Sequence, residues 1–200
     1  EYVQAFHDIP ALGGGFVWDW KDQGLLETDK NGELFWAYGG HFGDEPNDAN
    51  FCINGLTAPD GTPHPALKEY AWAARPVTVK KTGISLLAIK NRRIFEDTSD
   101  LRCEWVIEVD GKVIRSGERD FAIPPGETIT TRIPSFPRRE SKGEVFLHLK
   151  WVSVHPNGWS GEGHLVAWDQ IQLKGKRPDF TPQIPKIRQK FTLLESQIVE

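Results

Sequence analysis

The chain has 200 residues and a formal net charge of −4 at pH 7, a length that suits one large domain or two small ones. Its hydrophobic content of 38% supports a packed core, and its acidic balance excludes a basic face for nucleic acid or anionic lipid. No apolar stretch approaches the roughly 18 residues of a membrane span. The two cysteines, Cys52 and Cys103, form neither a zinc motif nor a disulfide framework, so we expect both to be reduced and buried.

The first part of the chain predicts few regular elements. Residues 1–12 are typical of the end of a helix that Pro10 stops. Residues 16–20 (FVWDW) predict a short strand, because they are rich in aromatic and β-branched side chains. A long loop over 21–65, dense in Gly, Asp and Asn, leads to a predicted helix over 65–75.

These elements are too few for a domain of their own. A helix, a strand, a polar loop and a second helix fit the closing part of a (β/α)8 barrel, which carries its sites on the loops that follow the strands. The alternative is an extension that packs on the next domain. We assign residues 1–75 to the C-terminal part of an incomplete (β/α)8 barrel, which the family resemblance described below implies to be a catalytic one.

After Pro76 the pattern changes to short alternating runs separated by turn signals such as Asp110-Gly111 and Asn157-Gly158. The runs cover residues 85–91, 102–110, 112–123, 128–133, 144–154 and 163–173. This spacing predicts an antiparallel β-sandwich over 76–174. Residues 175–200 begin with a Pro- and Lys-rich stretch that is typical of a linker, and their end is compatible with a first strand of a further domain.

Two features indicate chemistry. Trp18 lies at the end of the predicted strand, where an indole could stack on a sugar ring, although a place in a barrel core is an equally open interpretation. The loop over 38–55 gathers oxygen-bearing side chains of the kind that hard cations prefer. They are Asp44, Glu45, Asn47, Asp48, Asn50 and Asn54. The alternative for this loop is a solvated turn rich in Asx residues.

The same segments closely resemble the end of the catalytic barrel of LacZ-type β-galactosidases of glycoside hydrolase family 2. The resemblance rests on GGFVWDW (14–20), DQ (22–23), AYGG (37–40), FGD (42–44), PND (46–48), FC (51–52), NGL (54–56) and TPHPAL (62–67). It continues more loosely through Trp159-Ser160, Gly163-His164 and Ala167-Trp168. The resemblance implies that 76–174 is an immunoglobulin-like sandwich and that 175–200 leads into a missing terminal β-domain.

The family implies a retaining hydrolase that cleaves terminal β-D-galactose from β-galactosides such as lactose, using two glutamates. The resemblance places both glutamates upstream of this sequence, so it implies no catalytic residue here. Trp18 matches a tryptophan against the galactosyl group, and Phe51 matches a residue whose carbonyl binds Na⁺. Asn54 matches a side chain that binds that ion and the sugar, and Asn47 matches a position associated with a second, peripheral Mg²⁺.

One position departs from the family, because His41 stands where the family usually has Asp, a change that bears on the Mg²⁺ assignment more than on the Na⁺ assignment. The chain begins with Glu1 and contains no Met, so we expect its native N-terminus to lie outside this sequence. The resemblance further implies a cytoplasmic homo-oligomer completed by the upstream barrel and the downstream β-domain. The alternative function is a non-catalytic carbohydrate-binding or scaffolding β-sandwich.

Overall fold

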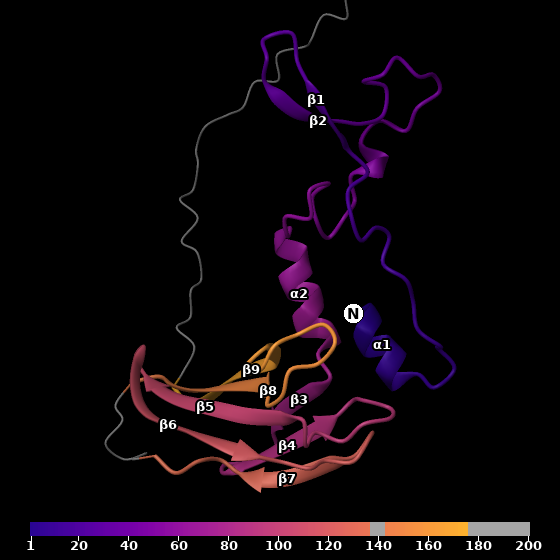
Figure 1. The fold of residues 1–200 in the computed structure, drawn as a ribbon. Coiled ribbons are helices and arrows are strands. Elements are labelled where there is room, and N and C mark those ends of the chain that lie inside the picture. Colours follow the sequence, from indigo (N-terminus) through magenta and orange to yellow (C-terminus); the bar gives the residue numbers. More distant parts are fainter. Residues whose placement is uncertain (137–142, 176–200) are drawn as a thin grey trace, which may run out of the picture.

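The computed structural model describes residues 1–136 and 143–175, and its N-terminal part forms an arm that stands on a body of β-sheets (Figure 1). The arm contains α1 (Tyr2–Asp8), β1 (Leu25–Thr28), β2 (Leu34–Ala37), a 3-10 helix η1 (Ala49–Cys52) and α2 (Pro65–Ala74). Both predicted helices are confirmed. α1 ends before Pro10, and Pro65 occupies the first turn of α2, where its missing N–H costs nothing.

The strand predicted over 16–20 is wrong, since the described residues contain no strand before Leu25. A strand needs a neighbour along its length. Here only the last residues of the segment meet another backbone, through hydrogen bonds from Asp19 N to Asn54 O (3.3 Å) and from Thr57 N to Trp20 O (3.0 Å).

The loop predicted over 21–65 contains the antiparallel hairpin β1–β2. Its turn is held by Asp29, whose Oδ1 accepts hydrogen bonds from Asn31 N and Glu33 N, both at 2.8 Å. Gly32 adopts a positive φ of 85° that favours glycine. The Asn31-Gly32 pair is a strong hairpin signal, so the long-loop prediction overlooked a readable pattern.

Within residues 76–136 and 143–175, the body consists of seven strands in two antiparallel sheets, and the runs after Pro76 predict six of them. The strands are β3 (Val77–Lys81), β4 (Leu86–Asn91), β5 (Leu101–Val109), β6 (Lys112–Asp120), β7 (Thr128–Arg132), β8 (Val145–Ser153) and β9 (Leu165–Lys174). One sheet has the order β3-β4-β7 and the other β6-β5-β8-β9. Only β3 has no counterpart among the predicted runs.

One hydrophobic core lies between the sheets. Inward-facing residues of the strands other than β6 form it, so Val77 and Ile89 from the smaller sheet meet Ile107, Leu147 and Trp151 from the larger one, all at most 1% exposed. Cys103 belongs to this core, and burial raises the pKa of its thiol to about 12. Cys52 is only half-buried, and both cysteines are free.

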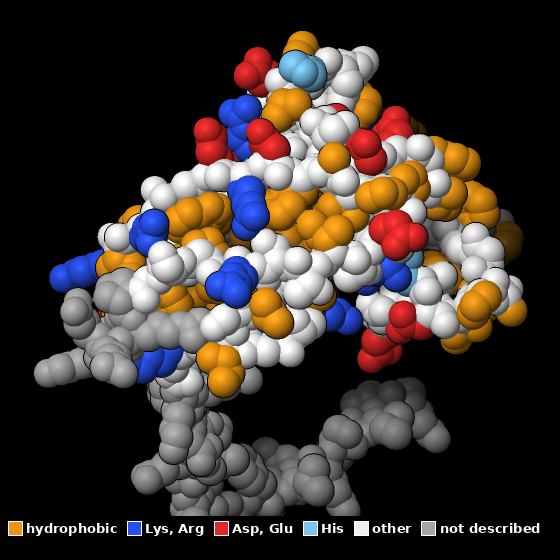
Figure 2. Space-filling model, turned by 90° about the horizontal axis from the view of Figure 1, so that it is seen from below, with side chains coloured by type: hydrophobic (Ala, Val, Ile, Leu, Met, Phe, Trp, Pro, Cys, Tyr) orange, Lys and Arg blue, Asp and Glu red, His pale blue; other side chains and the backbone are white. Residues whose placement is uncertain are grey.

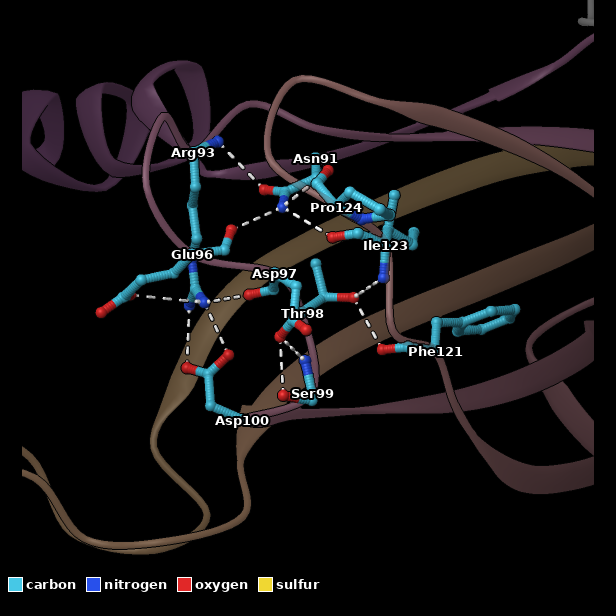
Figure 3. Close-up of polar contacts among 10 residues, drawn as sticks. All are labelled: Asn91, Arg93, Glu96, Asp97, Thr98, Ser99, Asp100, Phe121, Ile123 and Pro124. Atoms are coloured by element: carbon cyan, nitrogen blue, oxygen red, sulfur yellow. Dashed lines mark hydrogen bonds and ion pairs between the residues drawn. The ribbon is translucent and has the colours of Figure 1, made fainter.

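The connection from β4 to β5 is pinned by buried polar side chains (Figure 3). Asn91 is fully buried and donates hydrogen bonds from Nδ2 to Glu96 O at 2.8 Å and Ile123 O at 2.9 Å. Thr98 Oγ1 donates to Phe121 O at 2.7 Å and accepts from Ile123 N at 3.0 Å. These bonds attach the connection to the segment that crosses between the sheets.

A buried ion pair joins the arm to the body. Arg75, directly after α2, binds Asp169 of β9 with Nη2 at 2.7 Å from Oδ1. Asp169 Oδ2 also accepts a hydrogen bond from Val79 N at 3.0 Å, and the guanidinium lies over the Trp72 ring at 4.0 Å. Burial raises the pKa of Asp169 above its usual value, and the neighbouring Arg75 opposes that change.

The surface carries both signs of charge. On the face shown in Figure 2, Lys and Arg side chains are interspersed with Asp, Glu and apolar side chains. Within the described ranges, no helix has the length and apolar character needed to cross a membrane. The linker and strand predicted over 175–200 lie outside the described residues, apart from Gly175.

Candidate functional site

The candidate site is built on two backbone segments, 18–23 and 51–57, which we call the paired segments. Beyond the two bonds already given, they are joined by Leu56 N to Asp19 O (3.0 Å), Asp22 N to Thr57 O (2.9 Å) and Gln23 N to Cys52 O (2.9 Å). Lys21 and Thr57 form a parallel bridge. The pairing places Trp18, Phe51 and Asn54 on one locally fixed frame.

Trp18 is 76% exposed and begins the first paired segment. The peptide bond that follows it is cis. The next residue, Asp19, accepts hydrogen bonds from Trp20 N at 2.6 Å and Gln23 Nε2 at 2.7 Å. The bond from Gln23 and then the bond from Trp20 lower the pKa of the Asp19 carboxyl. Asp19 therefore organises the turn while the Trp18 indole keeps open surface.

The structure brings Phe51 and Asn54 together. η1 turns the chain so that the side-chain amide of Asn54 donates a hydrogen bond to the Phe51 carbonyl oxygen. A rotation of the Asn54 amide exchanges its Nδ2 and Oδ1. Amide and backbone carbonyl oxygens are ligands that hard cations accept.

Asn47 lies apart in its own turn. Its Nδ2 donates to Asp44 O at 2.9 Å, and its Oδ1 accepts from Ala49 N at 3.1 Å. Within residues 1–136 and 143–175, no group of three or more His, Cys, Asp or Glu side chains could hold a metal ion.

His41, at the position where the family usually has Asp, packs between two aromatic rings. Its ring lies edge-on to Tyr38 at 5.0 Å and to Phe35 at 5.6 Å between centroids. Its Nδ1 accepts a hydrogen bond from Tyr38 N at 3.0 Å. An imidazole here closes the turn that leads from β2 into the Asx-rich loop.

Sequence reasoning missed a contact between Asp22 and His64. Asp22 is only 6% exposed, and its Oδ2 lies 2.8 Å from His64 Nε2, while its Oδ1 accepts Gly55 N at 2.7 Å. Both residues belong to the DQ and TPHPAL motifs that carry the family resemblance. No spacing rule would have paired them, because they lie 42 positions apart.

Comparisons with known proteins cover both parts of the chain. Residues 1–79 match the family described as glycosyl hydrolases family 2, TIM barrel domain, and residues 87–174 match the family described as β-galactosidase, domain 4. The chain is 39% identical over 201 residues to "Beta-galactosidase 2" of Enterobacter cloacae, across 98% of this chain and 20% of that protein. It thus spans about one fifth of the length of this curated relative. The chain belongs to glycosyl hydrolase family 2, and the relative that it resembles carries the name of a β-galactosidase.

Proposed function

We propose that the whole protein containing this chain is a retaining β-galactosidase that removes terminal β-D-galactose from β-galactosides such as lactose. The observation that carries the proposal is the frame of the paired segments, which holds the family-matched residues Trp18, Phe51 and Asn54 together. The name of the Enterobacter cloacae relative supports the same substrate class.

In this proposal, the chain contributes residues that contact the sugar and the cation, whereas the two catalytic glutamates come from the rest of the protein. Retaining hydrolysis needs two carboxyl groups about 5–5.5 Å apart across the glycosidic bond. Of the carboxylates near the frame, Asp19 is engaged with Trp20 and Gln23, and Asp22 with Gly55 and His64. Trp18 would stack on the apolar face of the galactosyl ring.

For cations, we propose Na⁺ at Phe51 O and Asn54 Oδ1, and a peripheral Mg²⁺ near Asn47. The direct contact of Asn54 with Phe51 O supports the first assignment. A bound Na⁺ would supply a fixed positive charge that orients sugar hydroxyls. Both polar atoms of the Asn47 side chain are hydrogen-bonded within its own turn, so the Mg²⁺ assignment rests on the family resemblance alone.

The finer architecture follows the same proposal. Residues 1–75 are the end of a (β/α)8 barrel, 76–174 an immunoglobulin-like sandwich, and 175–200 a linker toward a terminal β-domain. Seven strands in sheets of three and four support the sandwich. The upstream barrel and the downstream β-domain are the proposed partners, in a homo-oligomer without nucleic acid or membrane. The free thiols of Cys52 and Cys103 suit a cytoplasmic location.

The test is an assay of the whole protein on a chromogenic β-galactoside and the matched β-glucoside, with Na⁺ or K⁺ as the only alkali cation. We expect a preference for the galactoside, Na⁺ activation, and release of the β-anomer of galactose in proton NMR. Release of the α-anomer or a preference for the glucoside would contradict the proposal. The alternative, a non-catalytic carbohydrate-binding module, is disfavoured by the barrel-family match over 1–79.

A further inference from the structure

Asp22 is a buried carboxylate inside the paired segments that touches none of the proposed ligand atoms. Its side chain is 5% exposed, and both of its oxygens are used. Oδ1 accepts the Gly55 N–H at 2.7 Å, and Oδ2 meets His64 Nε2 at 2.8 Å. Hydrogen bonds to a carboxylate are stronger than those to a neutral acceptor, so this group holds two distant pieces of chain firmly.

Gly55 sits against the first paired segment with no space for a side chain. A Cβ added there would lie 2.3 Å from Asp22 N and 2.6 Å from Lys21 C, both backbone atoms of that segment. The two backbones therefore touch at this point, and the Asp22–Gly55 bond closes the contact. Because Gly55 directly follows Asn54, any shift of Gly55 moves the amide that contacts Phe51 O.

His64 secures the other side of the same carboxylate. It is the residue that precedes α2, and its backbone N donates to Leu56 O at 2.9 Å while its ring meets Asp22. The second paired segment is thus held at Gly55 by Asp22 and at Leu56 by His64. The imidazole also fixes the direction of the Asp22 carboxylate toward Gly55.

We propose that Asp22, oriented by His64, is a positioning residue that fixes Asn54 and the Phe51 carbonyl relative to Trp18. The inference rests on the proposed function, since it concerns the cation and sugar ligands of the same site. It assigns Asp22 no contact with substrate and no proton transfer. Removing the Asp22 carboxylate should weaken the binding of the sugar and the cation more than it slows the chemical step.

The test compares Asp22→Ala, Asp22→Asn and His64→Ala in the whole protein. Readouts are kcat and KM on the chromogenic β-galactoside, and the Na⁺ dissociation constant from the rise in melting temperature with Na⁺ at constant ionic strength. The matched control is Asp29→Ala, because the Asp29 carboxylate, like that of Asp22, accepts backbone N–H bonds, but in the β1–β2 turn.

We expect Asp22→Ala to raise both KM and the Na⁺ dissociation constant about tenfold, the size expected when a buried N–H loses its partner, with kcat changed less than about threefold. Asp22→Asn should recover most of this loss, because its amide oxygen can accept the Gly55 N–H. His64→Ala keeps the Asp22–Gly55 bond and should raise both constants about threefold. Asp29→Ala should leave both unchanged.

Asp22→Ala or His64→Ala with wild-type KM and Na⁺ affinity would overturn the inference, as would a loss confined to kcat. If Asp22→Ala does not fold, His64→Ala and Asp22→Asn decide the question by the same measurements. A wild-type protein that hydrolyses no β-galactoside would instead sink the proposed function. The Na⁺ titrations of the variants would still test the positioning role of Asp22.

Discussion

Single side chains in the paired segments serve the backbone as well as the proposed pocket. Asp19 closes a turn with its carboxylate, and Asn54 contacts the Phe51 carbonyl that it would share with a cation. Trp18 differs, because most of its surface is exposed. Substitutions at Asp19 or Asn54 should therefore affect both folding and ligand binding, whereas a substitution at Trp18 should affect mainly ligand binding.

Trp18→Ala should impair catalysis without impairing stability. Losing the stacking surface should lower kcat/KM of the whole protein about tenfold, which corresponds to the roughly 1.5 kcal/mol of a favourable aromatic contact. The melting temperature should stay within about 2 °C, because an exposed side chain contributes little to the core. Steady-state kinetics and thermal melts measure the two effects.

The contrasting variant is Trp151→Ala, since Trp151 is fully buried and its truncation should cost about 3–5 kcal/mol of unfolding free energy. If Trp18→Ala behaves like it, melting early with normal kinetics per folded molecule, then Trp18 is a core residue.

Asn54→Ala should weaken sodium activation and raise KM in the whole protein. Losing one charge-assisted contact should cost about 1.5–3 kcal/mol of binding free energy. Rates measured over a Na⁺ titration at constant ionic strength give this cost. Asn31→Ala, in the exposed β1–β2 turn, is the control. Sodium dependence equal to wild type in Asn54→Ala would rule out its role as a ligand.

At the scale of the elements, buried side-chain hydrogen bonds fix the connection between β4 and β5. The β4–β5 connection has a buried network, and its tip exposes Ile94 and Phe95. The carboxylate of Asp100 also binds the Arg93 guanidinium, at 2.6 and 3.0 Å (Figure 3). This connection should therefore be as rigid as the strands that it joins.

Asn91→Ala should destabilise the chain by about 1–3 kcal/mol, because it leaves the buried carbonyl of Ile123 without its donor and also removes the part-buried bond to Glu96 O. Urea denaturation followed by tryptophan fluorescence measures the loss. Asn31→Ala again serves as the control and should stay within about 0.5 kcal/mol of wild type. A small effect of Asn91→Ala would mean that water replaces the lost donor.

At the scale of the whole molecule, a buried ion pair between Arg75 and Asp169 helps to join the arm to the sheets. Asp169→Ala should lower the free energy of unfolding by about 3–5 kcal/mol, because it leaves the Arg75 guanidinium buried and unpaired. Asp120→Ala, which removes an exposed partner of Arg102, should change it by no more than about 1 kcal/mol. Equal effects of the two variants in urea denaturation would contradict this role for the pair.

The 200-residue chain alone should hydrolyse no β-galactoside, because we place both catalytic glutamates in the rest of the protein. The measurement is an assay of the purified chain on the chromogenic substrate, with the whole protein as the positive control. The control is a double variant, Asp19→Asn with Asp48→Asn, because the activity of a contaminating enzyme would not change in it. Turnover that survives purification and disappears in this variant would show that catalytic carboxylates lie within these residues.

The sequence by itself determined both helices, most strands of the body and the family. Proline positions bound α1 and α2, and alternation of apolar residues revealed all the body strands but β3, because these signals depend only on near neighbours. The Asn31-Gly32 signal for the β1–β2 hairpin was equally local but was overlooked. Contiguous motifs carried the resemblance that pointed to Trp18, Asn47, Phe51 and Asn54 as site residues.

Only the tertiary structure decided which distant residues meet. It showed that residues 16–20 form no strand and that their end pairs with the segment around Asn54. It also joined Asp22 to His64 across 42 positions and Arg75 to Asp169 across 94. Such contacts leave no periodic trace in a sequence, because their partners are chosen by the packing of the whole chain and each pays for the entropy of closing a long loop.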